Sequence, residues 1–249
     1  MTKICAIIPA RYASTRFPAK PLADIAGKSM VQWVYSQAKR ATALAHVVVA
    51  TDDSKIFDHV KSFGGDVCMT SSDHASGTDR CYEALRSLPD EYDYVVNVQG
   101  DEPFIDPSQI DLLCGLLNGE TQLATLIKKI EREEHLFNPN VVKVVQSSRG
   151  EALYFSRSPI PHVRNTSQQQ WLARHTFYKH IGMYAYRTDV LARITQLSVS
   201  SLEKAESLEQ LRWLENGYSI KVAETTIETL GIDTPEDLQQ ALAYLRTKS

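Results

Sequence analysis

The chain has 249 residues, 43% of them hydrophobic, which is enough for the core of one large α/β domain or of two small ones. The formal net charge of −3 and the lack of a basic tail disfavour a nucleic-acid-binding protein. The first apolar run, 4–8, is too short for a signal peptide or a membrane span, and the four cysteines are widely spaced, so we expect a cytoplasmic protein with reduced thiols.

The first half of the chain alternates between two kinds of segment. Strand-like apolar runs at 4–8, 46–50, 67–69 and 94–98 are separated by amphipathic, helix-like segments at 30–43, 56–63 and 78–88. This alternation is typical of βαβ units, whose strands are parallel and buried on both faces. The pattern predicts an α/β fold, with a Rossmann-like, mostly parallel central sheet flanked by helices.

The second half changes character after about residue 130. β-rich segments at 141–146, 152–155 and 181–186 predict an insertion that forms a smaller lobe. Apolar positions between 202 and 214 share one helical stripe, which predicts a helix closed by Gly217. Thr234 and the proline and acidic residues after it predict the start of a last helix, which ends near Leu245. Without an internal repeat or a flexible linker, we expect a single domain over 1–249.

The loop after the first predicted strand carries three cations, Arg11, Arg16 and Lys20, among prolines and small residues. Arginine and lysine offer several donors to phosphate oxygens, and small neighbours let a ligand approach the main chain. The loop is therefore a candidate clamp for a polyphosphate. An ordinary solvated basic loop is the alternative, because the spacing matches neither a Walker A motif nor GxGxxG.

Two carboxylates are candidate metal ligands. Asp101 follows Gly100 directly after a predicted buried strand, where ligands of open α/β sheets gather, and Asp233 precedes the last predicted helix. Mg²⁺ takes few protein oxygens and leaves its other positions to phosphate and water. The alternative for Asp233 is a helix N-cap.

Other polar positions are less specific on their own. The segment 76–80, which includes Ser76, Gly77 and Arg80, is a small-residue turn that opens a helix and could bind an anion or a base edge, or only cap the helix. Arg157 ends a short strand, and His180 lies on another, where a structural role is the alternative. The sequence has no GxSxG motif, so a serine nucleophile is not supported.

Taken together, these segments resemble the 3-deoxy-manno-octulosonate (Kdo) cytidylyltransferases, relatives of the sugar-nucleotide pyrophosphorylases. The opening IPARYASTRFPAKPL would fit several cytidylyltransferases, whereas the combination of ALYFSR, HIGMYAYR and LEQLR is more specific. The remaining matching motifs are TDD at 51–53, DHASGTDR at 73–80, VNVQGDEP at 96–103, FNPNVVKVV at 137–145 and GIDTPEDL at 231–238. Phe17 and Ala19 replace the leucine and glycine often found in the loop, which should leave the cations in place.

The resemblance implies that the chain activates Kdo for lipopolysaccharide synthesis: CTP and Kdo give CMP-Kdo and diphosphate, with Mg²⁺ as cofactor. It implies a nucleotide-binding half (1–130), a sugar-binding and dimerisation half (131–249), and a homodimer with neither nucleic acid nor membrane as partner. Implied roles are the triphosphate clamp for Arg11, Arg16 and Lys20, the CTP pocket for Ala10, Ser76, Gly77 and Arg80, metal binding for Asp101 and Asp233, and Kdo binding for Gln99, Arg157, His180, Tyr184, Glu209 and Gln210.

Two alternative functions stay open at this point. The enzyme could act on another acidic sugar or on the 8-amino analogue of Kdo, and assays of diphosphate release with each sugar would separate these. A nucleotide-binding module without catalysis would be expected to lack a metal carboxylate, but Asp101 and Asp233 are both present.

Overall fold

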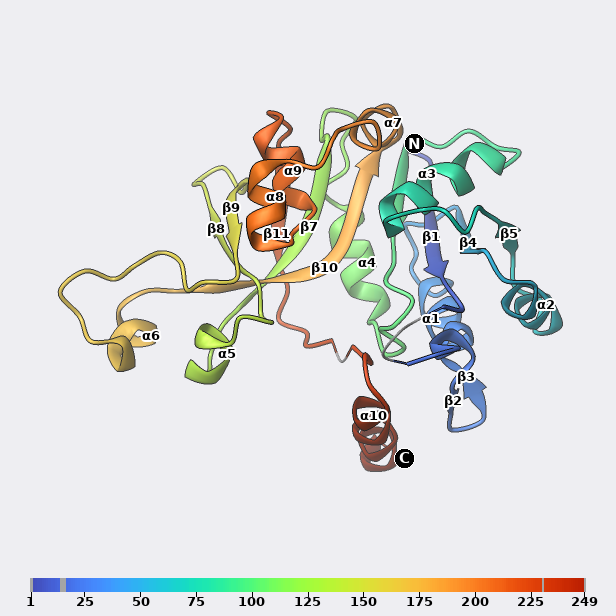
Figure 1. Cartoon of the computed structure of the whole chain (residues 1–249), viewed down its shortest axis with the longest axis horizontal. Coiled ribbons are helices and arrows are strands. Elements are labelled where there is room, and N and C mark those ends of the chain that lie inside the picture. The colour runs from blue at the N-terminus through green and yellow to red at the C-terminus, as the bar shows by residue number, and fades with distance from the viewer. Residues whose placement is uncertain (1, 14–16, 230, 249) are drawn as a thin grey trace. The chain divides into compact units, whose positions relative to one another are not determined.

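The computed structural model describes residues 2–13, 17–229 and 231–248, the last five of these by backbone only (Figure 1). It divides into two compact units. The first comprises Met1–Cys114 with Glu228–Ser249, and the second comprises Gly115–Ile227. This division differs from the two halves expected from the sequence, because the C-terminal segment packs with the first unit. No helix in the described ranges is long and apolar enough to cross a membrane.

The first unit is built on a parallel sheet. Its strands are β1 (Ile4–Ala10), β4 (His46–Thr51), β5 (Val67–Met69) and β6 (Tyr94–Asn97), in the order β6-β1-β4-β5. All three of these pairings are parallel, as the alternating pattern predicted. The helices between the strands are α1 (Met30–Ala38), α2 (Ser54–Ser62) and α3 (Gly77–Ser87).

Local sequence explains where these helices start. The side chains of Ser29, Asp53 and Ser76 accept hydrogen bonds from backbone N–H groups in the first turns of α1, α2 and α3, respectively. Helix α1 ends at Ala38, five residues earlier than expected. The carboxylate of Asp111 accepts hydrogen bonds from the N–H groups of Thr42 and Ala43, so this distant side chain stabilises a turn in place of further helix.

The C-terminal helix α10 (Pro235–Lys248) packs on the first unit. Ile232 and Ala241 form a buried cluster with Ile25 and Met30. Around it lie the short strands β2 (Asp24–Ile25) and β3 (Lys28–Ser29) and the 3₁₀ helix η1 (Lys20–Leu22), and helix α4 (Pro107–Cys114) completes the unit. The cluster fastens both ends of the sequence together, so Asp233 and the opening loop share a neighbourhood.

The second unit has a mixed sheet. Strand β7 (Leu123–Lys129) pairs in parallel with β11 (Ile220–Glu224) and antiparallel with β10 (Tyr178–Arg187). Strand β10 pairs with β8 (Lys143–Gln146), which pairs with β9 (Ala152–Ser156). The helices of this unit are α5 (Glu133–Phe137), η2 (Gln168–Gln170), α6 (Trp171–Arg174), α7 (Thr188–Ile194), α8 (Ser201–Glu206) and α9 (Gln210–Glu215). The predicted α/β class, with a β-rich lobe, is confirmed.

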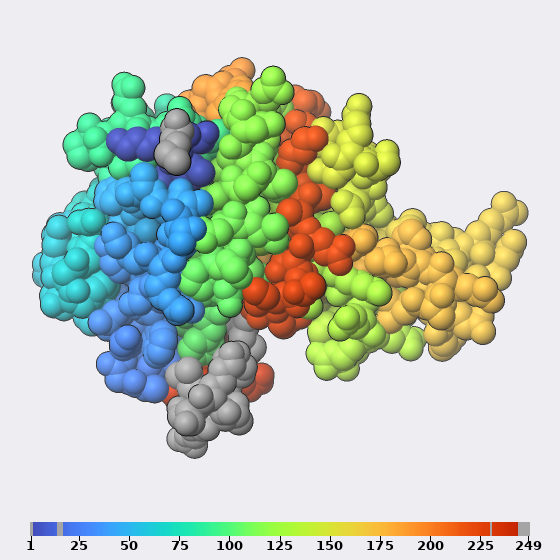
Figure 2. All heavy atoms as spheres, turned by 180° about the vertical axis from the view of Figure 1, so that it is seen from behind, coloured from blue at the N-terminus to red at the C-terminus, as the bar shows by residue number. Residues whose placement is uncertain are grey.

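The expected single helix over 202–214 is wrong. The chain forms α8 and α9 instead, because Ser207 between them adopts a left-handed conformation with φ 52° and ψ 48°. Gly217, with φ 81°, follows the end of α9 as predicted. The segment 157–177, which contains α6, extends away from the rest of this unit (Figures 1 and 2). Its Trp171 packs with Phe177 and with Leu136 of α5.

Candidate active site

The opening loop leaves the carboxyl end of β1. Arg11 is exposed, and the N–H of Ala19 donates to the carbonyl of Tyr12 over 3.1 Å, which closes the loop on itself. Lys20 then begins η1. Arg16 lies outside the described residues, so its expected place in the clamp stays a prediction. The described cations, Arg11 and Lys20, therefore flank a closed loop at one strand end.

Lys20 joins the two carboxylates that the sequence selected. Its Nζ lies 2.8 Å from Oδ2 of Asp101 and 3.1 Å from Oδ1 of Asp233. Burial acts to lower the pKa of Lys20, but the two carboxylates outweigh it, so this pKa is raised and the ammonium stays charged. Residues separated by most of the sequence therefore form one ion-pair cluster.

Backbone geometry fixes the position of Asp101. A Cβ at Gly100 would lie 2.5 Å from the carbonyl oxygen of Pro9, so only glycine lets the turn after β6 approach the end of β1 this closely. The N–H of Ile232 donates to the carbonyl of Asp101 over 2.9 Å and brings Asp233 alongside. These two contacts explain why distant carboxylates meet.

The carboxylate pair fits a metal whose other coordination positions are filled by phosphate and water. Asp101 and Asp233 already converge on one cation, the Lys20 ammonium, and oxygen donors suit Mg²⁺. No cluster of three or more His, Cys, Asp or Glu side chains placed to hold a metal occurs in the described parts of the chain. Two carboxylates leave the other coordination positions of a divalent ion to phosphate and water.

A third carboxyl, which sequence reasoning did not select, adjoins this pair. Burial, together with the neighbouring Asp101 carboxylate, raises the pKa of Glu102 to about 7, although a hydrogen bond with Thr229 opposes the shift. Its Oε2 is buried without a hydrogen-bond partner among the described residues. The acidic turn thus holds a carboxyl that ionises less readily than an ordinary glutamate.

The turn at the start of α3 lies against the ends of β1 and β6. A Cβ at Gly77 would lie 3.7 Å from both Nδ2 of Asn97 and Cγ of Pro9. Asn97 is 5% exposed, and its Oδ1 has no hydrogen-bond partner in the described structure. Sequence reasoning did not select Asn97, although a buried amide within the apolar run 94–98 was an available signal. The turn therefore packs closely on Pro9 and Asn97, beside an amide oxygen that lacks a hydrogen-bond partner among the described residues.

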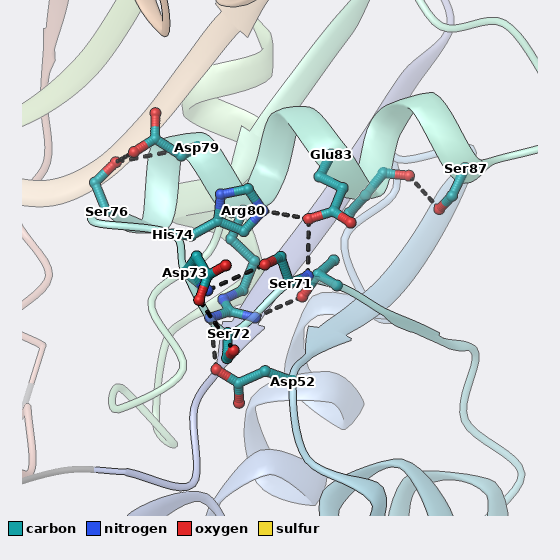
Figure 3. Close-up of polar contacts among 12 residues, drawn as sticks. Asp52, Ser71, Ser72, Asp73, His74, Ser76, Asp79, Arg80, Glu83 and Ser87 are labelled. Carbon is teal, nitrogen blue, oxygen red and sulfur yellow. Dashed lines mark hydrogen bonds and ion pairs between the residues drawn. The ribbon is translucent and has the colours of Figure 1, made fainter.

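Arg80, expected to line the CTP pocket, is fully buried in a polar network (Figure 3). Its guanidinium lies 2.8 Å from Oδ2 of Asp52 and donates to Oγ1 of Thr70. His74 contacts the carboxylate of Glu83 on α3, and that carboxylate also accepts from the N–H of Ser71 over 2.9 Å. These contacts hold the segment 70–76 against α3, so Arg80 stabilises the turn from a buried position.

In the second unit, the side chain of Arg157 is engaged with main-chain carbonyls. Its Nε donates to the carbonyl of Glu206 over 2.7 Å, Nη1 to that of Pro139 over 3.1 Å, and Nη2 to that of Ser207 over 3.3 Å. The N–H of Arg157 also donates to Oε2 of Glu206. The Arg157 guanidinium therefore links the end of β9 to the break between α8 and α9.

Lys143 is a buried cation that sequence reasoning missed. It is 0% exposed, and its Nζ donates to the carbonyls of Asn138 and Val141 over 2.9 and 2.6 Å. Burial lowers the pKa of Lys143, Glu206 opposes this, and Arg157 adds to it. Two cations and one carboxylate thus surround this strand end, an arrangement that favours a bound anion.

His180 and Tyr184 lie on β10 among aromatic rings. The His180 ring is 5.2 Å from Phe155 and 5.1 Å from Tyr184 between centroids, and the Tyr184 ring is 5.0 Å from Trp213. Burial lowers the pKa of His180 to about 3, and burial also raises the pKa of Tyr184 well above its ordinary value. Both side chains are therefore neutral near pH 7.

The remaining candidate residues are placed as follows. Glu209 is the N-cap residue of α9, and its charge contributes to the raised pKa of Tyr184. Gln210, at the start of α9, is 6% exposed, and the half-buried Gln99 follows β6 in the first unit. The structure thus brings Lys20, Asp101 and Asp233 together in one unit, and Glu209 and Tyr184 in the other.

Comparisons with known proteins agree with this fold. The chain belongs to the cytidylyltransferase family, whose profile matches residues 5–240. Within it, the chain is 62% identical over 236 residues to the 3-deoxy-manno-octulosonate cytidylyltransferase of Cytophaga hutchinsonii, covering 94% of each chain. It is 58% identical to the Parabacteroides distasonis protein of the same name, over the full length of both.

Two solved structures are similar to this chain. A CMP:2-keto-3-deoxy-manno-octonic acid synthetase, complexed with CTP, matches with a TM-score of 0.93, 43% identity and full coverage of both chains. The 4-diphosphocytidyl-2C-methyl-D-erythritol synthase of Anaerococcus prevotii matches at a TM-score of 0.63 and 15% identity, covering 98% of this chain and 96% of that one. The second match concerns the fold alone.

Proposed function

We propose that the chain transfers CMP from CTP to the anomeric hydroxyl of Kdo and releases diphosphate. The observation that carries this proposal is the convergence of Asp101 and Asp233 on Lys20, because it supports a cation site at the strand ends where a triphosphate would bind. The identity to Kdo cytidylyltransferases supports the choice of substrates.

The reaction needs no protein nucleophile. The anomeric oxygen of Kdo attacks the α-phosphorus of CTP in line, the bond from that phosphorus to the diphosphate oxygen breaks, and the hydroxyl proton is released. Arg11, Arg16 and Lys20 would hold the triphosphate and balance the charge that develops on the leaving diphosphate. Alignment and charge neutralisation therefore account for the catalysis that the chain itself supplies.

Asp101 and Asp233 would hold Mg²⁺, which supplies further neutralisation of phosphate charge when bound. Lys20 would then turn from the carboxylates toward phosphate, because an anionic substrate offers its ammonium a stronger partner. The raised pKa of Lys20 supports this role, since the group remains a cation in either position.

The nucleoside would lie against Ala10 and the turn at Ser76 and Gly77, where the absence of a side chain on Gly77 leaves the backbone accessible. Arg80 would act from behind this turn through Asp52 and Thr70. Asn97 adds an amide oxygen without a partner among the described residues, which would accept a hydrogen bond from a base edge.

Kdo would be bound by the polar groups of β9, β10 and α9, while the expected role of Gln99, which lies in the first unit, stays a prediction. Arg157 and the buried Lys143 supply positive charge for its carboxylate, while His180, Tyr184, Glu209 and Gln210 supply hydrogen-bonding groups for its hydroxyls. The homodimer, the cytoplasmic location and the part of residues 131–249 in dimerisation stay predictions.

The decisive experiment measures diphosphate release from CTP with Kdo, 8-amino-Kdo and another acidic sugar, each with and without Mg²⁺. We expect the largest kcat/KM with Kdo, and activity only with the metal present. Asp101→Ala should reduce kcat by about 100-fold or more, since it removes a ligand of the Mg²⁺ that would neutralise the charge of the reacting phosphate. The matched control is Asp58→Ala, which removes an exposed carboxylate from α2. Absence of turnover with Kdo, or normal kcat in Asp101→Ala, would contradict the proposal.

A further inference from the structure

The environment of His180 holds its imidazole in one orientation. The half-buried ring lies between Phe155, which it meets edge-on at 81°, and Tyr184, which is tilted by 42°. The backbone N–H of His180 also donates to the carbonyl of Val142 over 2.9 Å. Packing on both sides of the ring and a fixed backbone leave little rotational freedom. The hydrogen bonds at the two ring nitrogens then decide which of them carries the proton.

Thr125 of β7 contacts one of those nitrogens. Its Oγ1 lies 3.0 Å from Nε2 of His180, 2.8 Å from the carbonyl oxygen of Met183 and 3.1 Å from that of Ile181. These carbonyls flank a break in the β7–β10 register, between Ile181 and Tyr184. The hydroxyl therefore occupies a β-bulge in which carbonyl groups need a donor.

Hydrogen-bond chemistry allows one satisfactory arrangement. A hydroxyl has a single proton, and a carbonyl oxygen can only accept. If Thr125 donated to Nε2, its oxygen lone pairs would face both carbonyls without an intervening proton. If it donates to Met183 instead, Nε2 must carry hydrogen and donate to Oγ1. His180 then has Nε2–H, and its Nδ1 has a free lone pair.

On the other side of the ring lie polar groups that are available to a ligand. Neither Nδ1 of His180 nor the hydroxyl of Tyr184 has a hydrogen-bond partner in the described part of the chain, and that hydroxyl is buried. Tyr184 keeps its proton near neutral pH because burial raises its pKa. An acceptor nitrogen and a phenolic hydroxyl on neighbouring rings suit the alternating donors and acceptors of a polyol.

We propose that Thr125 is a positioning residue that fixes His180 in the Nε2–H tautomer, so that Nδ1 and the Tyr184 hydroxyl form a neutral subsite for hydroxyl groups of the sugar acid. The sugar part of this inference rests on the proposed function. The subsite binds by neutral hydrogen bonds and leaves the substrate carboxylate to the cations of the same unit. His180 orients a hydroxyl there rather than removing its proton, because its pKa of about 3 is far from that of an effective base at neutral pH.

The tautomer is tested without any activity measurement. Nitrogen-15 NMR of the intact protein, with the His180 signals assigned by their loss in His180→Gln, distinguishes a protonated Nε2 from a protonated Nδ1. We expect the Nε2–H pattern in the wild-type protein at pH 7. An Nδ1–H pattern, or a charged imidazole, overturns the inference whatever the enzyme's substrate is.

Variants of Thr125 test the positioning role. Thr125→Val keeps the shape and removes the hydroxyl, so we expect mixed tautomers and a KM for Kdo raised about tenfold, with the KM for CTP unchanged. Thr125→Ser restores the hydroxyl and should restore both the spectrum and the KM. The matched control is Thr195→Val on the same unit, because its hydroxyl also donates to carbonyls, those of Leu191 and Ala192 on α7.

The two proposals fail in different ways. An Nε2–H spectrum in a protein that does not use Kdo would refute the proposed function and the sugar subsite, and would support the tautomer assignment alone. Turnover of Kdo with an unchanged spectrum and KM in Thr125→Val would support the function and refute the role of Thr125.

Discussion

The ammonium of Lys20 lies 2.8 Å from the carboxylate of Asp101, although 81 positions separate the two residues in the sequence. The same carboxylate is the one expected to bind Mg²⁺, so ammonium and metal compete for one anionic position. Under the proposed function, binding of CTP would resolve this competition, because its phosphates would provide Lys20 with another anionic partner.

Lys20→Met should therefore strengthen metal binding in the absence of CTP. Removing the ammonium leaves Asp101 and Asp233 without their shared cation, so we expect the affinity for Mn²⁺, measured by electron paramagnetic resonance, to rise about tenfold. Turnover should fall in the same variant, since the triphosphate loses a cation. Lys61→Met, an exposed lysine of α2, should change neither quantity. Weaker Mn²⁺ binding in Lys20→Met would show that the carboxylates are not the metal site.

Arg80→Met should destabilise the fold as well as weaken CTP binding. The change leaves the carboxylate of Asp52 beside an apolar side chain, and breaking a buried ion pair in this way costs about 3 kcal/mol. Urea unfolding monitored by circular dichroism gives this difference directly. The matched control is Arg86→Met on α3, where the guanidinium is exposed. Equal stability of the two variants would mean that the Arg80 network contributes nothing to the fold.

Arg157→Met should raise the KM for Kdo and also loosen the break between α8 and α9. The guanidinium donates to three carbonyls there, so its loss leaves acceptors without partners, at a cost of about 1–2 kcal/mol. Steady-state kinetics with each substrate and hydrogen exchange of residues 201–211 separate the two effects. Arg164→Met, exposed on the segment 157–177, is the control. An unchanged KM for Kdo removes Arg157 from the sugar site.

Acidification should destabilise the wild-type protein more than His180→Gln. The pKa of His180 is about 3 when folded, below its value of 6.5 when unfolded, so between these values the unfolded chain binds the extra proton. This stabilising contribution is complete above pH 6.5 and is lost as the pH falls toward 3. The free energy of unfolding of the wild type, relative to the variant, should fall by about 1 kcal/mol per pH unit from pH 6 to 4.

Urea titrations at pH 4, 5, 6 and 7 measure this difference. His162→Gln is the control, because the His162 side chain is exposed. A difference between wild type and His180→Gln that stays constant over this range would show that His180 is not buried as a neutral ring.

Local sequence predicted the elements with strong signals. The strand Val67–Met69 has the expected bounds, and the α3 helix starts at its serine cap within one residue of the expected start. The prediction of one helix over 202–214 was wrong, because the spacing of apolar residues carries no information about the backbone of Ser207. That residue adopts a left-handed conformation, which Arg157 stabilises through a hydrogen bond to the Ser207 carbonyl. Strand β7 was not predicted at all. Long-range contacts decided these features, and no local pattern records them.

The sequence by itself determined the parallel βα order of the first unit, the cationic loop, the acidic turn after β6 and, through its motifs, the family. Each of these depends on residue types and spacing within a short window. Only the tertiary structure decided that Lys20 bridges Asp101 and Asp233, that Arg80 is buried against Asp52, and that Thr125 contacts His180. Such contacts join residues distant in the chain, and burial, which sets their charges and hydrogen bonds, exists only once the chain has folded.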